Sequence, residues 1–169
     1  MLHSKKLFFT IIVVGCSIFT QVVNATQSGQ TNLKLHGTIQ VVECTINDGV
    51  DKEVNFGDAV GIHRVDGTRY KQPVPFEVVC TNTEGGEIPQ LELTIEGEKT
   101  TFDSAAVKTN IDGFGIQFQE NETPIELNKS FSFDYVSAPK LTAVPVKDIS
   151  TELDASDFYA TVKLIVEVA

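Results

Sequence analysis

The sequence predicts an antiparallel β-sandwich crosslinked by one disulfide. Apolar and polar residues alternate in many short segments, as they do in strands with one buried face and one exposed face. Turn-forming residues separate these segments, and no convincing amphipathic helix interrupts them. Two cysteines, Cys44 and Cys80, fall in such segments. About seven antiparallel strands spaced by turns form the pattern of a sandwich.

Residues 1–25 are predicted to be a signal peptide. Lys5 and Lys6 precede an apolar stretch, and the small residue Ala25 suits a cleavage site. A membrane anchor is the alternative, but the apolar run is short and polar residues follow it at once. A lipoprotein cut at Cys16 would leave a very short apolar region. Cleavage after residue 25 of the 169 leaves 144 residues, enough for one domain with a substantial core.

The predicted mature chain is strongly acidic. The sequence has 13 Lys and Arg residues against 23 Asp and Glu residues, and losing Lys5 and Lys6 leaves 11 basic residues and a net charge of −12. Such a surface repels nucleic acid and anionic lipid, so both are excluded as partners. No further segment is long and apolar enough to span a bilayer, and no membrane insertion of the mature chain is expected.

The first strand-like segment lies just inside the predicted mature N-terminus. Its alternate positions form one mostly apolar face, comprising Thr31, Leu33, Leu35, Gly37 and Ile39. The residues between them are polar, so the segment has one dry face and one wet face. Termini of most domains are frayed, and a terminal strand of this quality needs a groove to fill. The residues alone leave two interpretations open. The segment is the first strand of this chain's own sheet, or it is a strand that fills a groove in another molecule.

In the N-terminal half of the domain, alternation predicts three strand-like segments. They cover residues 38–46, 53–60 and 72–80. Asn47-Asp48-Gly49 forms a turn after the first, and Asp66-Gly67 marks a loop or hairpin after the second. Pro73 and Pro75 place the third segment at a sheet edge, because proline cannot donate a ladder hydrogen bond.

In the C-terminal half, Leu91, Leu93 and Ile95 alternate with polar residues and predict a half-buried strand. Further strands are expected at residues 114–118, 131–135 and 158–168, of which the last is a long alternating segment. Residues 97–110 are polar and irregular. Residues 138–157 contain two prolines and are expected to form a long connection.

Cys44 and Cys80 are predicted to form a disulfide. An exported chain with two cysteines in strands favours this pairing, and closing a loop of about 36 residues would stabilise the fold by roughly 3–4 kcal/mol. A zinc site is the rival interpretation. It lacks ligands, because only His36 and His63 remain and neither stands at ligand spacing from the cysteines. No metal and no cofactor are expected.

No catalytic constellation emerges from the sequence. Glu120, Glu122 and Glu126 could suggest a carboxylate pair for sugar hydrolysis, but they occupy a turn and a strand flank, where a solvated face is the simpler interpretation. The serines lack a Gly-x-Ser-x-Gly setting. The chain is therefore predicted not to be an enzyme.

Several segments follow one another in a characteristic order. They are Leu33-Lys34-Leu35-His36-Gly37-Thr38-Ile39, Cys44-Thr45-Ile46-Asn47, Val54-Asn55-Phe56-Gly57, Phe76-Glu77-Val78-Val79-Cys80, Gly113-Phe114-Gly115-Ile116-Gln117-Phe118 and the C-terminal strand. This set resembles the pilin subunits of the chaperone–usher family (type 1 and P pili) over essentially the whole mature chain. The segments around Cys44 and Phe56 look most like minor subunits of the tip region. One departure is Val168, where the family often has an aromatic residue.

The resemblance implies an incomplete immunoglobulin-like sandwich that lacks its final strand. Residues 26–39 would form an N-terminal donor-strand extension, and residues 40–169 the pilin domain. The strand at 158–168 would have nothing left to pair beyond it, which leaves a groove with an unpaired edge. A periplasmic chaperone would fill this groove first, and the extension of a neighbouring subunit would replace the chaperone by strand addition.

The resemblance also implies site residues. The donor strand would insert Thr31, Leu33, Leu35, Gly37 and Ile39, and burying each large side chain contributes about 1.5–3 kcal/mol. Gly37 would mark the closest approach of the donor and acceptor backbones. The strand that meets the chaperone and forms the acceptor groove would comprise Phe158, Ala160, Val162, Leu164, Val166, Val168 and Ala169.

The expected function is that of a structural subunit of an adhesive surface pilus. Its partners would be neighbouring pilus subunits, the periplasmic chaperone and the outer-membrane usher, and its route would lead through the periplasm to the surface fimbrium. A sugar-binding tip adhesin is one alternative, but such proteins normally carry an extra lectin domain, for which the mature chain leaves no room. A secreted β-sandwich protein unrelated to pili is the other, and it would be soluble and monomeric when expressed alone.

Overall fold

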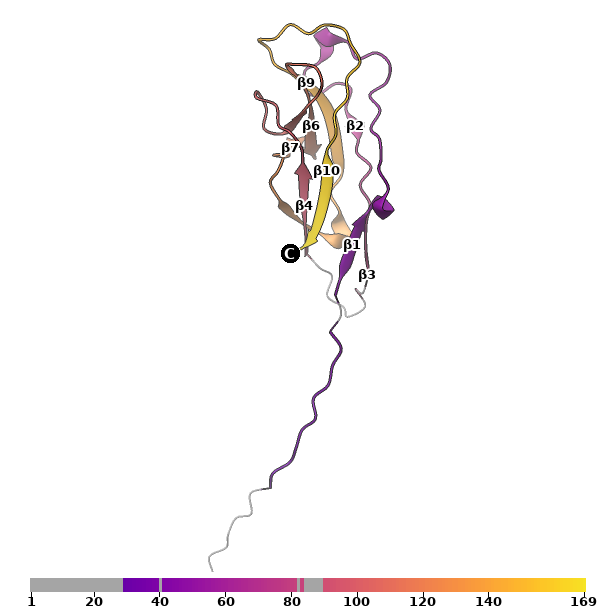
Figure 1. Ribbon diagram of the computed structural model, residues 1–169, viewed down its shortest axis with the longest axis vertical. Coiled ribbons are helices and arrows are strands. Elements are labelled where there is room, and N and C mark those ends of the chain that lie inside the picture. The colour runs from indigo at the N-terminus through magenta and orange to yellow at the C-terminus, as the bar shows by residue number, and fades with distance from the viewer. Residues whose placement is uncertain (1–28, 40, 82, 84–89) are drawn as a thin grey trace, which may run out of the picture. The chain divides into compact units, whose positions relative to one another are not determined.

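The computed structural model describes residues 29–39, 41–81, 83 and 90–169, and the predicted signal peptide lies outside these residues. The chain divides into two units, Met1–Gly37 and Thr38–Ala169. In the described part of the first unit the residues are exposed and belong to no helix or strand. The second unit is a β-sandwich (Figure 1).

Strands dominate the described part of the second unit, and the three helices there are single 3₁₀ turns. The strands are β1 (Glu43–Ile46), β2 (Gln72–Pro73), β3 (Val78–Thr81), β4 (Gln90–Glu96), β5 (Ala106–Lys108), β6 (Phe114–Glu120), β7 (Thr123–Pro124), β8 (Phe131–Asp134), β9 (Leu141–Lys147) and β10 (Lys163–Val168). The helices are η1 (Asn47–Gly49), η2 (Ile62–Arg64) and η3 (Tyr135–Ser137). In the described residues no helix is long and apolar enough to cross a bilayer.

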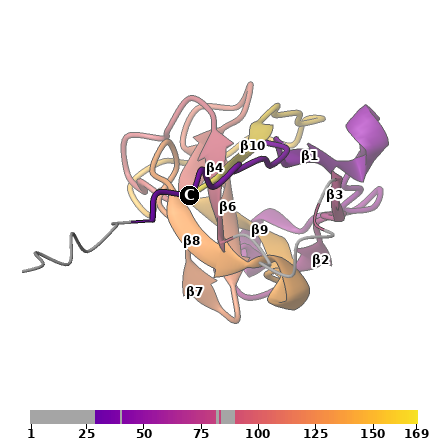
Figure 2. The ribbon, with the colours of Figure 1, turned by 90° about the horizontal axis from the view of Figure 1, so that it is seen from below.

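The strands form sheets in which the pairings are antiparallel. One sheet has the order β2-β9-β6-β5, with β7 also on β6, a second has the order β10-β4-β8, and β1 pairs with β3. Strand β10 is hydrogen-bonded to β4 on one side and lies beside β1 on the other (Figures 1 and 2). The expected all-β sandwich is thereby confirmed.

The core lies between the sheets and follows the period-two alternation of the strands. Leu91, Leu93 and Ile95 of β4 are fully buried, while the residues between them point outward. The apolar residues of β6 and β9 complete the core from the opposite sheet, with Phe114, Ile116, Phe118, Leu141 and Ala143 buried. Alternation along β4 and β6 therefore predicted the buried face correctly.

Two segments predicted to be connections contain strands. Strand β9 occupies the middle of residues 138–157 and pairs with both β2 and β6. Its Pro145 lies opposite Ile116, whereas β2 pairs only with Thr142 and Ala143, so the proline falls where one edge of β9 has no paired neighbour. Proline is tolerated there because no ladder bond is lost. Strand β5 similarly lies within the polar segment 97–110.

Other predicted strands are shorter than expected or divided. The segment 38–46 forms a strand only from Glu43 onward. The segment 72–80 is split between β2 and β3, because its two ends pair with different sheets. Residues 53–60 and 158–162 belong to no strand, although both alternate. These two unpaired segments face the groove described next.

Candidate functional site

An apolar groove with a volume of about 1590 Å³ runs along one side of the sandwich. One wall is the segment 50–60, which follows β1 and η1. The other wall is the segment 153–164, which leads into β10. Core side chains form the floor, among them Phe114, Ile116 and Phe118 of β6. The groove therefore gives access to the inside of the sandwich.

Each wall of the groove has backbone groups without a hydrogen-bond partner among the described residues. Among the described residues, no hydrogen-bond partner is found for the backbone groups of Val54 and Phe56 on the first wall, or of Phe158 and Ala160 on the second. Tyr159, which alternates with these two, bonds away to Asn110: its N–H donates to Asn110 Oδ1 at 2.8 Å, and its carbonyl accepts from Asn110 N–H at 3.3 Å. The second wall is thus held in place while one edge stays free.

Inward-pointing side chains from the two walls meet at one point of the groove. The ring of Phe158 lies 5.8 Å from the ring of Phe56 on the opposite wall and 4.9 Å from Phe114 on the floor, measured between centroids. We call Phe56 and Phe158 the ring pair. Val54, Val60 and Val162 are other inward-pointing wall residues, and all of these side chains are only half-buried.

The rim of the groove is predominantly acidic. The lining residues include five exposed carboxylates, Asp51, Glu53, Asp58, Asp154 and Asp157, against the ammonium groups of Lys52 and Lys163. In the described residues none of these carboxylates takes part in an ion pair. The same part of the chain contains no cluster of three or more His, Cys, Asp or Glu residues able to hold a metal ion.

The carboxylates with displaced pKa values lie outside the groove. Hydrogen bonds from the Arg69 N–H, the Thr68 hydroxyl and the Thr68 N–H lower the pKa of Asp66 to about 2. The Lys99 ammonium lowers the pKa of Glu126, and the backbone N–H of Ser150 lowers that of Asp148. None of these three groups lines the groove. The groove is therefore characterised by its shape and by backbone groups without hydrogen-bond partners among the described residues, not by carboxylates with displaced pKa values.

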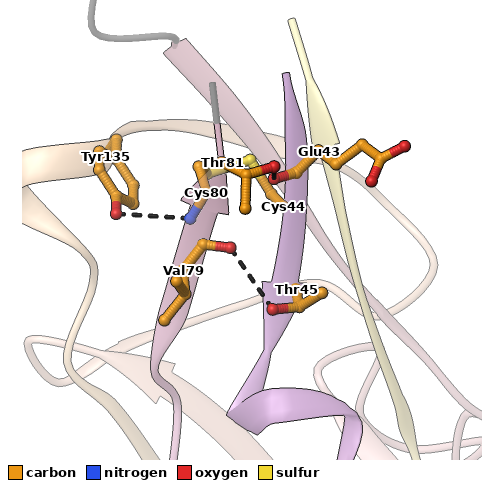
Figure 3. Close-up of a disulfide and its surroundings, with 7 residues drawn as sticks. All are labelled: Glu43, Cys44, Thr45, Val79, Cys80, Thr81 and Tyr135. Atoms are coloured by element: carbon orange, nitrogen blue, oxygen red, sulfur yellow. Dashed lines mark hydrogen bonds between the residues drawn. A yellow bond between two sulfur atoms is a disulfide. The ribbon is translucent and has the colours of Figure 1, made fainter. Parts of the chain in front are cut away.

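The predicted disulfide joins Cys44 of β1 to Cys80 of β3, which lie directly opposite each other in the strand pair (Figure 3). On β3, Cys80 N–H donates to the Tyr135 hydroxyl at 3.4 Å, and the Thr45 hydroxyl of β1 donates to the Val79 carbonyl at 3.4 Å. Because the first wall continues directly from β1 and η1, the disulfide fixes the base of that wall.

Four residues of the predicted acceptor strand line the groove: Phe158, Ala160, Val162 and Leu164. The others lie further along the chain. Val166 and Val168 pair opposite Leu93 and Leu91 of β4, and Ala169 N–H donates to the Gln90 carbonyl at 2.9 Å.

Sequence reasoning missed the first wall, with Val54, Phe56 and Val60, as part of the site. A detectable signal was present, because these residues alternate with polar ones, as inward-pointing residues of a strand do, while Gly57 interrupts the segment.

The predicted donor residues are all described and all exposed. Leu33 is 81% exposed, Leu35 85% and Ile39 95%. A Cβ built on Gly37 would meet nothing within 4 Å. Large apolar side chains exposed in a row are unfavourable in water.

An apolar floor between two unpaired strand edges can accept an extended peptide. Main-chain hydrogen bonds to the free edges supply affinity, and alternate side chains that enter the core supply specificity. Leaving such an edge bare invites aggregation, so an occupant also protects the chain.

Comparison with known proteins agrees with this geometry. Residues 33–169 match the family model described as fimbrial protein. The chain is 31% identical over 166 residues to the fimbrial-like protein YfcQ of Escherichia coli (strain K12), covering 95% of this chain and 98% of that protein.

Solved structures of pilus subunits share the fold. The P pilus adaptor subunit PapF is 25% identical with a TM-score of 0.55, covering 75% of this chain and 95% of that chain. The P pilus rod subunit PapA is 17% identical with a TM-score of 0.56, covering 82% and 100% respectively. With its immunoglobulin-like sandwich, its disulfide and its family match, the chain belongs to the fimbrial protein family and is a pilus subunit.

Proposed function

We propose that this subunit polymerises by donor-strand exchange. The groove receives a β-strand from a neighbouring subunit, after a periplasmic chaperone has occupied it and as the outer-membrane usher brings subunits together for export to the surface fimbrium. The observation that carries the proposal is the open apolar groove, whose walls leave the backbone groups of Phe56 and Phe158 without partners among the described residues. A strand added between the walls would satisfy these groups.

The donor strand comes from the segment that precedes the domain. Leu33, Leu35 and Ile39 are exposed in the free chain, and each would gain about 1.5–3 kcal/mol from full burial in a neighbour's groove. Thr31 is the small residue at the leading end. The polar residues between them, such as Lys34, would remain at the surface.

The ring pair suggests where Gly37 lies in the groove. Phe56 and Phe158 already occupy the space between the walls at that point, so a strand that crosses above them has no room for a side chain. Glycine is the residue that passes there without displacing a ring. In this register Leu35 and Leu33 follow on one side of the rings and Ile39 on the other.

The proposal is tested by following a tagged chain into sheared surface fibres of the source bacterium. Leu35→Asp places a charge on the buried face of the donor strand and is expected to remove the chain from the fibres. His36→Asp introduces the same charge on the outward face of the same strand and is the matched control, in which incorporation should fall by no more than roughly fivefold, the effect of one exposed charge. Normal incorporation of Leu35→Asp would overturn the proposal.

Gly37→Val gives a second, independent test. The residue stands in open space in the free chain, so the variant folds normally and its chaperone complex persists. Incorporation into fibres should nevertheless fail, because the valine methyl groups would collide with the ring pair. Fibres that contain the variant in normal amounts would exclude the donor role of this segment.

A further inference from the structure

Charge is distributed unevenly between the two partners of the proposed strand addition. The predicted arm, residues 26–39, contains Lys34 and His36 and no acidic residue, whereas all 23 Asp and Glu residues lie in the remaining mature sequence. The groove rim carries five exposed carboxylates and two lysines. The arm of this chain is therefore basic, whereas the groove rim in every copy of the same chain is acidic.

The register set by the ring pair brings particular residues side by side. With Gly37 above Phe56, an arm that runs in the same direction as the first wall places residue 34 beside residue 53. Both positions point outward: Lys34 lies between the apolar positions Leu33 and Leu35, and Glu53 alternates with the inward-pointing Val54. Neighbouring outward side chains on adjacent strands are within reach of each other.

The direction of the arm follows from the pairing rules of the sheet. The second wall leads directly into β10, which belongs to a sheet whose pairings are antiparallel, so an arm that extends this sheet runs antiparallel to the second wall. The first wall runs opposite to that segment (Figure 1), so the same arm is parallel to the first wall. In the opposite direction, residue 34 would lie beside Ala59 and no charge would be matched.

We propose that Lys34 of one copy pairs with Glu53 of a second copy, so that this chain recognises its own arm and follows itself in the fibre. The inference rests on the proposed function and names its partner. Glu53 is exposed, lines the groove and has no ion-pair partner among the described residues, so it is available to an incoming lysine. Length also fits, because the arm residues 31–39 are fewer than the residues of the second wall, 153–164.

A cysteine crosslink tests the register and the partner together. Lys34→Cys and Glu53→Cys are placed on two differently tagged copies expressed in the same cells, and sheared fibres are run on non-reducing gels. Adjacent strands hold Cα atoms at a separation that suits a disulfide, so a covalent product carrying both tags is expected. Lys34→Cys with Ala59→Cys is the matched control, and it should yield no such product.

Charge reversal tests the ion pair itself. Glu53→Lys should lower the frequency with which one copy follows another by roughly two- to fivefold, the effect of one exposed ion pair, and adding Lys34→Glu to the same chain should restore it. Glu77→Lys makes the same charge change as Glu53→Lys at an exposed position outside the groove and should have no effect.

The outcomes separate the two proposals. If Leu35→Asp abolishes incorporation but the 34–53 product is absent, strand addition stands and the neighbour is a different subunit, which overturns this inference. A product from Ala59→Cys instead would show the opposite strand direction and overturn it equally. A third chain carrying both Lys34→Cys and Glu53→Cys is the test for pairing within one copy. If the 34–53 disulfide forms in that chain but not between the differently tagged copies, the arm fills its own groove and this inference is overturned. If Leu35→Asp has no effect on incorporation, the proposed function itself fails.

Discussion

Strand β4 and the walls of the groove have the same alternating pattern but opposite surroundings. Leu91, Leu93 and Ile95 of β4 are fully buried, and the strand is hydrogen-bonded to β8 on one side and to β10 on the other. Phe56 and Val162 of the walls remain half-exposed beside an unpaired backbone. The difference shows that alternation determines which side chains point inward, whereas a neighbouring strand determines whether they are covered.

The largest effect is expected when a fully buried side chain of β4 is shortened. Leu93→Ala should lower the free energy of unfolding by about 2–5 kcal/mol, because it leaves a cavity in a fully buried site. Val162→Ala in the groove wall should cost only about 1 kcal/mol in the free chain, since water already reaches that side chain. Urea unfolding of both variants measures the contrast. Equal losses would mean that the wall is as well covered as β4.

Removing the disulfide tests how strongly the first wall depends on its base. Replacing Cys44 and Cys80 together by serine opens a loop spanning 36 positions of sequence, with an expected loss of roughly 4 kcal/mol in the chain-entropy model. Unfolding of the oxidised chain, the reduced chain and the double variant measures this loss. The reduced chain lacks the disulfide but keeps both cysteines, so it separates the loss of the crosslink from any effect of the serine hydroxyls. If the oxidised chain, the reduced chain and the double variant all unfold at the same urea concentration, the prediction is contradicted.

Two glycines sharpen the comparison between packed and open regions. A Cβ on Gly115 of β6 would lie 2.6 Å from Thr100 Cγ2 and 3.0 Å from the Val107 carbonyl oxygen, so Gly115→Ala should lower the free energy of unfolding by about 1–3 kcal/mol. Gly37→Ala meets no atom within 4 Å and should leave this free energy unchanged. Thermal and urea unfolding check both, and a destabilised Gly37→Ala would show packing of that residue in the free chain.

The smallest expected effect concerns the exposed loop that contains Asp66. A hydrogen bond from Gln119 Nε2 of β6 to the Gly67 carbonyl holds this loop against the packed part of the domain. The pKa of Asp66 is lowered from 3.8 to about 2, so its folded-state pKa lies below the unfolded one. The stabilisation is therefore complete above the unfolded pKa and disappears as the pH falls through about 2. An NMR titration should find a midpoint near 2 in the parent chain.

The Thr68→Ala variant removes one donor to Asp66 and should raise the midpoint of the titration toward the ordinary value. A parent midpoint already at the ordinary value would contradict the hydrogen-bonded loop.

Much of the closed half was predictable because its signals are local. Alternation located β4, β6 and β8, the cysteine pair located the contact between β1 and β3, and Asn47-Asp48-Gly49 located the turn η1. Strand β9 was missed because a proline such as Pro145 normally indicates that a segment is not a paired strand. Here the proline is tolerated because β2 pairs only with Thr142 and Ala143 and does not reach Pro145. Strand β5 was missed because three residues are too few to show a period.

The candidate site was predictable only in part for the same reason. Residues 53–60 and 158–162 resemble strands locally, and nothing within either segment says that the other stands across a gap. The contact between Phe56 and Phe158 joins positions about a hundred residues apart, so only the folded chain shows it.

The sequence by itself determined the inward faces, the disulfide partners and the family, because side-chain period, cysteine count and ordered motifs are properties of the linear chain. The tertiary structure decided which strand edges are paired and which are open. Pairing depends on distant segments meeting in one register, and local alternation does not encode that meeting. The groove between the walls is the consequence.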